Sequence, residues 1–385
     1  MSLFCWLAMV AFIPMTLSTE PGVKVRLTAK GIEYGRQLGM ASLQEKLKAI
    51  RVPDFSGKRR VSVIGRVRYR LSNIVIMSVG LLTSAVNLVP GTGVKMSISG
   101  AFISLRGNWR VKYLFIRDRG YFDLDVRALS ISASIAISSD ATGHPAVSSA
   151  NCAANAGSAK VKFHRGASWL YNLFSKYINR ALRRAINKQI CPLVTKAVSD
   201  MNPLLQTLNV LARVDKHAEI EYSMVSSPSV TASFIDLNLK GEFYNIRNHQ
   251  EPPFSPKAIS LPPQVNNMVY ISLSAFTANS AGFVYNRAGI LSQDVTDDMI
   301  PRLSPIRLNT KTFGVFIPEI ARRFPGLMMK LVVKATKDPI VTFEPNKMTV
   351  NVTGTVTAYA IQPNATLSSL FVLNLVGYTA GMMKR

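Results

Sequence analysis

The amino-acid sequence predicts an α+β protein in which long antiparallel strands curl into a barrel and pack against a long helix. Residues Val61–Ser138 alternate between apolar and polar side chains, which is the period of half-buried strands. Residues Ser168–Leu211 repeat apolar side chains at helical spacing, which predicts one long amphipathic helix. A twisted sheet with one apolar face can bury that face by curling around such a helix. The chain has 385 residues, which exceeds one ordinary core, so we expect two domains.

The predicted long helix has an apolar stripe and a basic stripe. Its apolar residues recur in steps of four: Trp169, Leu173, Tyr177, Ala181 and Ala185. Its basic face forms a secondary candidate for anion binding and consists of Arg180, Arg183, Arg184 and Lys188. Pro192 is expected to kink or break the helix, because proline has no N–H and its ring clashes with the preceding turn.

Other elements of the N-terminal half follow from the same patterns. Val23–Leu27 alternates like a strand, and Thr28–Ile50 is predicted to be a helix with Thr28 as its cap. The segment Ala141–Ala159 is rich in Ser, Ala and Asn and is predicted to be a loop.

The C-terminal half repeats this order of elements. The segment 251–263 contains five prolines and is predicted to be an extended linker. After it, Met268–Leu273 is expected to be a strand and Ser274–Leu291 a short helix. Pro90-Gly91 with Lys95 recurs as Pro325-Gly326 with Lys330, which suggests a duplicated domain. A counterpart of the long helix would then begin near position 403, beyond Arg385. We therefore expect either an incomplete second barrel, from a fragment or splice variant, or no duplication.

These patterns divide the chain into four parts. Residues 1–18 read as a signal peptide, with an apolar core at Leu3–Ile13 and small residues before the expected cleavage site. Residues 19–250 form the N-terminal barrel with part of a central sheet, 251–263 the linker, and 264–385 the second, incomplete barrel. A signal peptide predicts a secreted, extracellular protein, which could also be stored in granules.

Two cysteines remain after the signal peptide, Cys152 and Cys191. In an oxidising compartment such a pair is most simply a disulfide, and the alternative is two buried free thiols. Two cysteines are too few for a structural zinc site of four ligands.

The formal net charge of +25 predicts attraction to polyanions such as nucleic acid, anionic membranes or acidic glycans. Between Lys58 and Arg119 there are 12 basic residues and a single acid, Asp118. Apolar residues make up 48% of the chain, which indicates a large core or a bound apolar ligand. The basic partner surface therefore belongs to the N-terminal half.

Several stretches together resemble the family of the bactericidal permeability-increasing protein and the lipopolysaccharide-binding protein. They are Pro21-Gly22-Val23, Ile103–Arg110, the cysteine pair, Lys240–Tyr244 followed by Pro252-Pro253-Phe254, and Asp297–Pro301. The resemblance runs from about Pro21 to Gly381. It implies a boomerang of two elongated barrels of twisted antiparallel strands joined by a central sheet. Each barrel would have a long helix and an apolar pocket for phospholipid, and the cysteine pair would form a disulfide.

The resemblance also implies that the tip of the N-terminal barrel binds lipid A and the phosphates of bacterial lipopolysaccharide. Arginine can contact phosphate in bidentate fashion, lysine acts as a point charge, and tryptophan can sit at a polar–apolar boundary. The alternative is a generally basic, solvated surface. The candidate residues are Lys58, Arg59, Arg60, Lys95, Arg106, Trp109, Arg110, Lys112, Arg117 and Arg119.

No motif for catalysis or metal binding is found, so we expect no enzyme, no metal and no cofactor other than bound phospholipid. Asp297-Asp298 is more simply the N-terminal charge of a helix. Asn351 and Asn364 stand in glycosylation sequons.

We expect a secreted innate-immune protein that binds lipopolysaccharide, phospholipid and anionic bacterial membranes and acts against Gram-negative bacteria. Alternatives are a plasma-type phospholipid transfer protein, delivery of lipopolysaccharide to a receptor without killing, and a basic nucleic-acid or heparin binder. The last does not explain the excess of apolar residues, so no specific nucleic-acid partner is expected.

Overall fold

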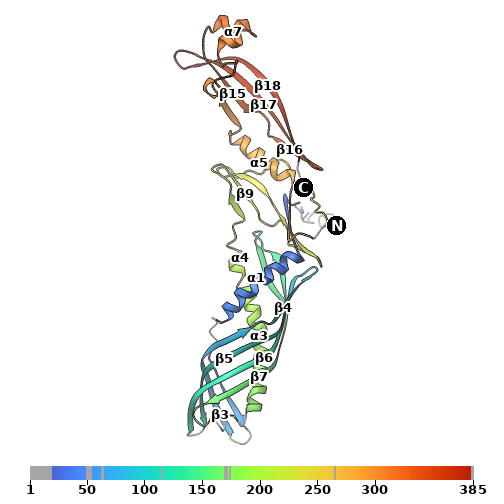
Figure 1. Cartoon of the computed structure of the whole chain (residues 1–385), viewed down its shortest axis with the longest axis vertical. Coiled ribbons are helices and arrows are strands. Elements are labelled where there is room, and N and C mark those ends of the chain that lie inside the picture. Colours follow the sequence, from blue (N-terminus) through green and yellow to red (C-terminus); the bar gives the residue numbers. More distant parts are fainter. Residues whose placement is uncertain are drawn as a thin grey trace, which may run out of the picture.

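The protein is described here by a computed structural model covering residues 20–382, except 49–53, 62–64, 114–115, 169–171, 173–174 and 264–265. The predicted signal peptide lies outside the described residues. The molecule is an elongated rod with one large sheet at each end and smaller sheets between them (Figure 1). This arrangement of antiparallel sheets with few helices confirms the predicted α+β class.

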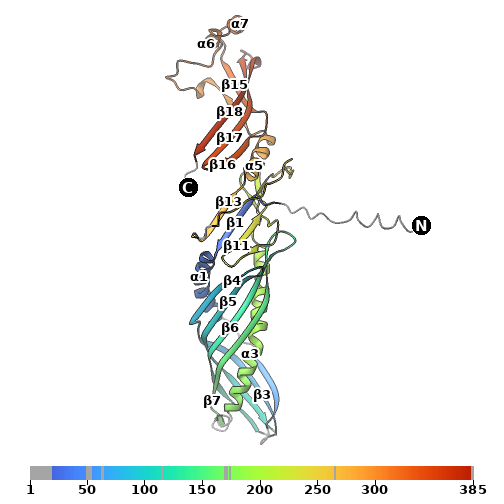
Figure 2. The ribbon, with the colours of Figure 1, turned by 90° about the vertical axis from the view of Figure 1, so that its right-hand side faces the viewer.

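The N-terminal sheet has six strands in the order β2-β3-β5-β6-β7, with β4 paired to β5. The strands are β2 (Phe55–Val61), β3 (Gly65–Gly80), β4 (Thr83–Val89), β5 (Gly93–Tyr113), β6 (Ile116–Ser139) and β7 (Pro145–His164). All neighbouring pairs are antiparallel. The alternating run in the sequence therefore becomes a curled sheet with one apolar face, which packs along a long helix, α3 (Ser175–Ser199) (Figure 2).

The prediction of a loop at Ala141–Ala159 is wrong, because most of this segment belongs to β7. The strand pairs with β6 along its whole length. Its inward side chains are small, and Ala156 and Ala159 are buried. Small side chains let α3 approach the strand closely. The Ser, Ala and Asn residues that suggested a loop therefore allow the helix to pack against the sheet.

The free edge of β7 is covered by amide side chains from the helical segments. Four backbone N–H groups of β7 donate to asparagine oxygens: Phe163 to Asn172 at 3.1 Å, Val161 to Asn179 at 2.8 Å, Ala156 to Asn187 at 2.7 Å, and Val147 to Asn202 at 2.8 Å. Asn202 begins the short helix α4 (Asn202–Leu205). An uncovered edge strand would expose unpaired donors and acceptors, so these asparagines close the sheet at this side.

A disulfide also joins β7 to α3. We call the contact between these two elements the seam. Cys152 of β7 and Cys191 of α3 are joined, with their Cα atoms 5.6 Å apart. In the chain-entropy model, a bridge over this loop length stabilises the fold by ~3–4 kcal/mol. The helix runs through Pro192 without a break, so of the predicted kink or break the break is excluded. The carbonyl that loses its partner there belongs to Lys188, on the exposed side of the helix, where solvent can satisfy it.

The main core lies between the N-terminal sheet and its helices. Phe122, Leu124 and Val126 of β6 are buried in it. The facing side of α3 supplies half-buried residues, Ile178, Leu182, Ile186 and Ile190. The helix α1 (Ala29–Lys48), which follows the predicted first strand, adds Met40.

A central sheet joins the two halves of the chain. Strand β1 (Val23–Thr28) lies between β11 (Phe234–Leu239) and β13 (Val269–Leu273), and β10 (Ser229–Val230) borders β11. Segments far apart in the sequence therefore share one sheet.

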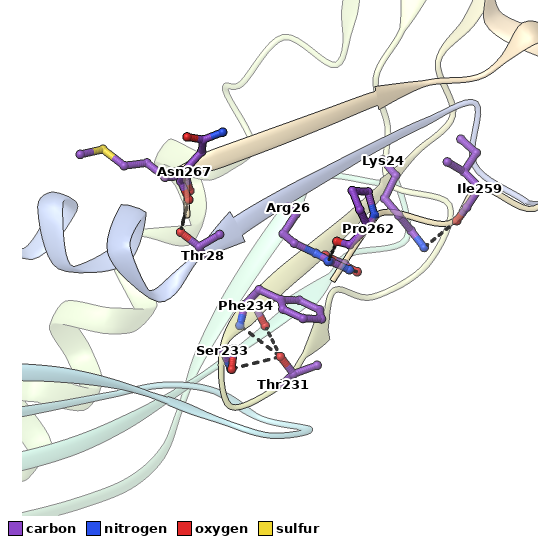
Figure 3. A network of polar contacts seen from close by, with 11 residues as sticks. Lys24, Arg26, Thr28, Thr231, Ser233, Phe234, Ile259, Pro262 and Asn267 are labelled. Carbon is purple, nitrogen blue, oxygen red and sulfur yellow. Dashed lines mark hydrogen bonds and ion pairs between the residues drawn. The ribbon is translucent and has the colours of Figure 1, made fainter. Parts of the chain in front are cut away.

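A buried ion pair holds this sheet together. The Arg26 guanidinium donates two hydrogen bonds to the Asp236 carboxylate, at 2.7 and 2.8 Å, and lies 3.6 Å from the Phe234 ring centroid. These hydrogen bonds raise the pKa of Arg26 above its ordinary value. Figure 3 shows that Arg26 also donates to the Pro262 carbonyl, and Lys24 to that of Ile259. The proline-rich segment is thus fastened to β1.

A small sheet and a short helix lie beyond the central sheet. The sheet has the order β12-β9-β8, formed by β12 (Glu242–Asn245), β9 (Ala218–Glu221) and β8 (Leu211–Arg213). The predicted short helix is α5 (Ala275–Arg287), and its cap Ser274 accepts from the Thr277 N–H. Its buried Phe283 and Val284 pack on Ala218 of β9.

The C-terminal sheet has five strands, with β17 at its centre. The strands are β14 (Ser292–Val295), β15 (Met329–Ala335), β16 (Ile340–Glu344), β17 (Lys347–Ile361) and β18 (Leu367–Met382). One edge of β17 pairs with β16 and β15, and the other with β18. Short helical turns follow β14: η1 (Asp297–Met299), α6 (Thr310–Gly314) and α7 (Pro318–Arg323).

Candidate anion-binding surface

Basic side chains form two rows across the outer face of the N-terminal sheet, close to its tip. Strand register places four cations side by side in the first row: Lys58, Arg68, Lys112 and Arg117. The second row, two residues further along each strand, contains Arg70, Arg110 and Arg119. We call these seven residues the cation rows. Because side chains two apart on a strand share a face, all seven point the same way.

The cation rows are exposed and largely without counter-ions. All seven side chains are exposed. Among the described residues, Arg70 alone of the seven forms an ion pair, with Asp54 at 2.8 Å. Like charges placed directly opposite on neighbouring strands destabilise a sheet. The arrangement therefore has an electrostatic cost to the free protein, which a bound polyanion would relieve.

Further from the tip, the outer face of the sheet carries an acidic side chain beside the basic ones. Arg106 of β5 lies opposite Asp123 of β6 and donates to it at 2.7 Å. This hydrogen bond lowers the pKa of Asp123 below its ordinary value, and His164 lies 3.0 Å from the same carboxylate. Asp123 also lies opposite Lys162 of β7. This row contains one carboxylate for its two basic residues, whereas the cation rows contain no carboxylate, so the excess of positive charge is greatest at the tip.

The structure brings together most of the predicted anion-binding residues but separates Lys95. Lys95 is exposed on the same strand as Lys112, 17 positions earlier in the chain. At about 3.3 Å per residue the two side chains lie roughly 55 Å apart. Arg60 is exposed beside Arg66 near the β2–β3 turn, and the side chain of Arg59 lies outside the described residues.

Trp109 was predicted at a surface boundary, and this placement is wrong. Its side chain is 1% exposed and packs in the core against the Phe163 ring. The indole N–H donates to the Tyr121 carbonyl at 3.0 Å, which satisfies its one polar group. Gly120 lies so close to the ring that an added Cβ would stand 2.8 Å from the indole nitrogen. Trp109 therefore supports the strands that carry the cation rows and does not contact ligand.

Three cations at the tip were not among the predicted site residues: Arg66, Arg68 and Arg70 of β3. Their alternation with apolar residues was visible in the sequence. The pairing of β3 with β2 and β5 places Arg68 between Lys58 and Lys112, and it places Arg70 opposite Arg110 and Arg66 opposite Arg60.

The secondary basic face of the long helix is exposed as a separate surface. Arg180, Arg183, Arg184 and Lys188 are all exposed on α3. Arg183 donates to the Gly157 carbonyl at 3.3 Å, so this residue also belongs to the seam with β7. These cations follow the helix axis and do not continue the cation rows.

A pocket of about 330 Å³ opens between α1 and the N-terminal sheet. Met40, Leu81 and Leu82 contribute apolar side chains to its lining, but most of the exposed lining is polar, from residues that include Arg36 and Gln44. Arg36 pairs with Glu33 on its own helix.

The two sequons lie in different surroundings. Asn364 is exposed in the turn between β17 and β18, where its oxygen accepts from the Thr366 N–H and hydroxyl. Asn351 lies within β17, paired on both sides, and its side-chain oxygen is buried without a partner among the described residues. This geometry favours Asn364 as a glycan acceptor over Asn351.

The described part of the chain contains no group of three His, Cys, Asp or Glu side chains arranged to hold a metal ion. No helix within the described ranges is both long enough and apolar enough to cross a membrane.

The fold defines an elongated protein of antiparallel sheets in which a long helix lies against the N-terminal sheet. The model of the N-terminal domain of the LBP / BPI / CETP family matches residues 31–207, and the model of its C-terminal domain matches residues 212–382. The chain therefore belongs to the LBP / BPI / CETP family.

Its relatives include a bactericidal permeability-increasing protein from Sebastes schlegelii, 71% identical over 376 residues, covering 97% of this chain and 80% of the relative. A lipopolysaccharide-binding protein from Homo sapiens is 36% identical over 364 residues, covering 94% and 76%. A crystal structure of lipopolysaccharide binding protein superposes with a TM-score of 0.59 at 32% identity, covering 95% of this chain and 80% of that one. These similarities confirm the predicted family.

Proposed function

We propose that this protein binds bacterial lipopolysaccharide through the cation rows at the tip of its N-terminal sheet. The observation that carries the proposal is the first row, in which Lys58, Arg68, Lys112 and Arg117 lie side by side and exposed. Lipid A presents two phosphates on a sugar core above its acyl chains, and an array of cations matches such a headgroup. The names of the relatives, which include lipopolysaccharide-binding proteins, support the same ligand.

Binding would proceed in two stages. The net charge of +25 first draws the protein to anionic bacterial membranes, and this attraction weakens as salt rises. Arginines of the rows then form charge-assisted hydrogen bonds to phosphate, while lysines contribute point charges. Neither stage breaks a covalent bond, so the protein is proposed to act as a binding protein and not as an enzyme.

Phospholipid is the proposed second ligand. Acyl chains would pack along the half-buried apolar face of α3, and Met40, Leu81 and Leu82 at the pocket beside α1 would extend that apolar surface. This pocket also favours a second candidate function, phospholipid transfer, which does not require the cation rows. The rows make antibacterial lipopolysaccharide binding the preferred function. Secretion follows from the signal peptide and the disulfide, and Asn364 is the proposed glycan site.

The test is a titration of the purified protein against lipopolysaccharide, neutral phospholipid vesicles and DNA, at low and high salt. The proposal expects a clear preference for lipopolysaccharide at both salt concentrations. Equal affinity for the three ligands would refute it, and preference for neutral vesicles would favour phospholipid transfer. Assays of bacterial killing and of receptor delivery, run with the same preparation, then separate the two lipopolysaccharide functions.

A further inference from the structure

Apolar side chains gather in solvent at the end of the rod opposite the cation rows. Between α6 and α7 three consecutive residues, Val315, Phe316 and Ile317, are exposed, and Val315 and Phe316 keep 78% and 75% of their surface in solvent. We call these three residues the apolar crown. Figure 2 shows α6 and α7 at the far end of the molecule from β3. In the loop before α6, Leu303 is 99% exposed.

The apolar crown stands on a well-packed base. Phe313 of α6 stacks against Phe371 of β18, with ring centroids 6.1 Å apart, and Ile320 of α7 is buried. Asn309 caps α6 by accepting from the Thr312 N–H at 2.7 Å. The buried Thr310 hydroxyl accepts from the Leu327 N–H at 2.9 Å. The same short segment thus turns some apolar residues inward and holds the crown outward.

The charges around the crown are predominantly positive. Between Asn309 and Phe324 the chain has three basic residues and one acid. Glu319 pairs with both Arg322 and Arg323, at 2.8 Å each, so one positive charge of this trio remains. Lys311 is exposed and forms no ion pair with any described residue. Exposed apolar residues rimmed by cations are typical of elements that enter a membrane interface.

We propose that the apolar crown inserts into the surface of an anionic phospholipid bilayer. Val315, Phe316 and Ile317 would enter the boundary between headgroups and acyl chains, while Lys311 and the arginines of α7 contact the headgroups. A second copy of this chain is the less suitable occupant, because the crowns of two copies carry the same positive charge and would repel. The N-terminal and C-terminal tips then bind lipid by different chemistry.

The experiment places an environment-sensitive fluorophore on a cysteine at the crown, Phe316→Cys, and a matched one at Lys337→Cys. Lys337 is exposed in the turn between β15 and β16. The probe is vesicles of phosphatidylcholine with phosphatidylglycerol and no lipopolysaccharide, at high salt to suppress the cation rows. The crown label is expected to shift to shorter wavelength when vesicles are added, whereas the Lys337 label stays unchanged.

A double variant, Val315→Ser with Phe316→Ser, is expected to reduce vesicle partitioning about tenfold, because two apolar side chains no longer enter the lipid. The matched control, Val269→Ser with Ile271→Ser, removes two exposed apolar side chains from β13 in the middle of the rod and is expected to bind like the wild type. An unchanged crown label, equal partitioning of both double variants, or concentration-dependent dimers abolished by the crown variant would overturn the proposal. Lipopolysaccharide is absent from this assay, so its result is independent of the proposed function.

Discussion

The two ends of the molecule are both built on antiparallel sheets, yet they expose different side chains. At the N-terminal end the cation rows place basic residues side by side, and Trp109 of β5 is buried. At the C-terminal end the apolar crown is exposed, and Phe316 keeps 75% of its surface in solvent. Phosphate recognition requires the first chemistry and insertion into lipid the second. The comparison teaches that one elongated fold can expose basic side chains at one end and apolar side chains at the other.

The sheet edges differ as well. At β7 the outermost backbone groups donate to asparagines of the helical segments, and a disulfide joins the two elements. At β18 the described residues provide pairing with β17 alone, and Val372, Leu375 and Tyr378 are exposed. The N-terminal sheet is therefore closed at this edge, whereas the described edge of the C-terminal sheet is open.

Charge reversal at the tip is expected to have the largest effect. Lys112→Glu removes a cation from the centre of the first row and adds repulsion, so affinity for lipopolysaccharide should fall about 10- to 100-fold. The matched control is Lys95→Glu, an exposed reversal on the same strand far from the tip, and it should change affinity little. Isothermal titration of both variants measures the difference. Equal losses would mean that overall charge, and not the rows, determines binding.

The closed edge predicts a stability effect of intermediate size. Asn187→Ala leaves the buried Ala156 N–H without its acceptor, which should lower the free energy of unfolding by about 1–3 kcal/mol. The neighbouring exposed change Lys188→Ala should stay within about 0.5 kcal/mol. Denaturant unfolding measures both, and hydrogen exchange should show slower amides in β7 than in β18 in the wild type. Similar exchange in the two strands would contradict the described difference between the edges.

The ion pair between Arg106 and Asp123 predicts a smaller, pH-dependent effect. Arg106 lowers the pKa of Asp123, so the Asp123 carboxylate stabilises the folded state at pH values above its unfolded pKa, about 3.9. This contribution is lost as pH falls through the lowered pKa of the folded state. Both groups are partly exposed, so the contribution should be under about 1 kcal/mol. Thermal unfolding of the wild type and Asp123→Asn should differ at neutral pH and converge in strong acid; a constant difference would show that the ion pair is not its cause.

Relief of repulsion within the rows predicts the smallest effect. Lys112→Gln removes one of several like charges on neighbouring strands, and should raise the free energy of unfolding by a few tenths of a kcal/mol at low salt. The gain should disappear at high salt because screening already weakens the repulsion. A loss of stability at low salt would mean that Lys112 makes a stabilising contact within the folded protein and is not available to bind an anion.

Periodicity in the sequence was enough to predict most of the fold. The alternating strands, the first strand and helix, and the short helix after the linker all appear where the pattern placed them. Most of strand β7 was missed because its inward side chains there include small residues such as Ala156 and Ala159, which give little apolar period. The seam asparagines were missed for a related reason, since their role depends on a strand that the sequence did not reveal.

The sequence predicted which part of the chain carries the candidate site, but not which of its residues lie side by side. Composition identified the basic N-terminal half, whereas strand register decides which cations are neighbours. Register placed Arg68 between Lys58 and Lys112, and the length of β5 removed Lys95 from the group. Burial of Trp109 depends on packing against Phe163 and Gly120, which only the folded sheet brings together.

The most direct test compares lipopolysaccharide with the same material after removal of its lipid A phosphates. The wild type is expected to bind the phosphorylated form at least about tenfold more tightly, since each charge-assisted hydrogen bond contributes about 1.5–3 kcal/mol. The double variant Arg68→Gln with Lys112→Gln should lose most of this preference while keeping its affinity for neutral phospholipid vesicles. Equal binding of both forms by the wild type, or an undiminished preference in the variant, would contradict phosphate recognition by the cation rows.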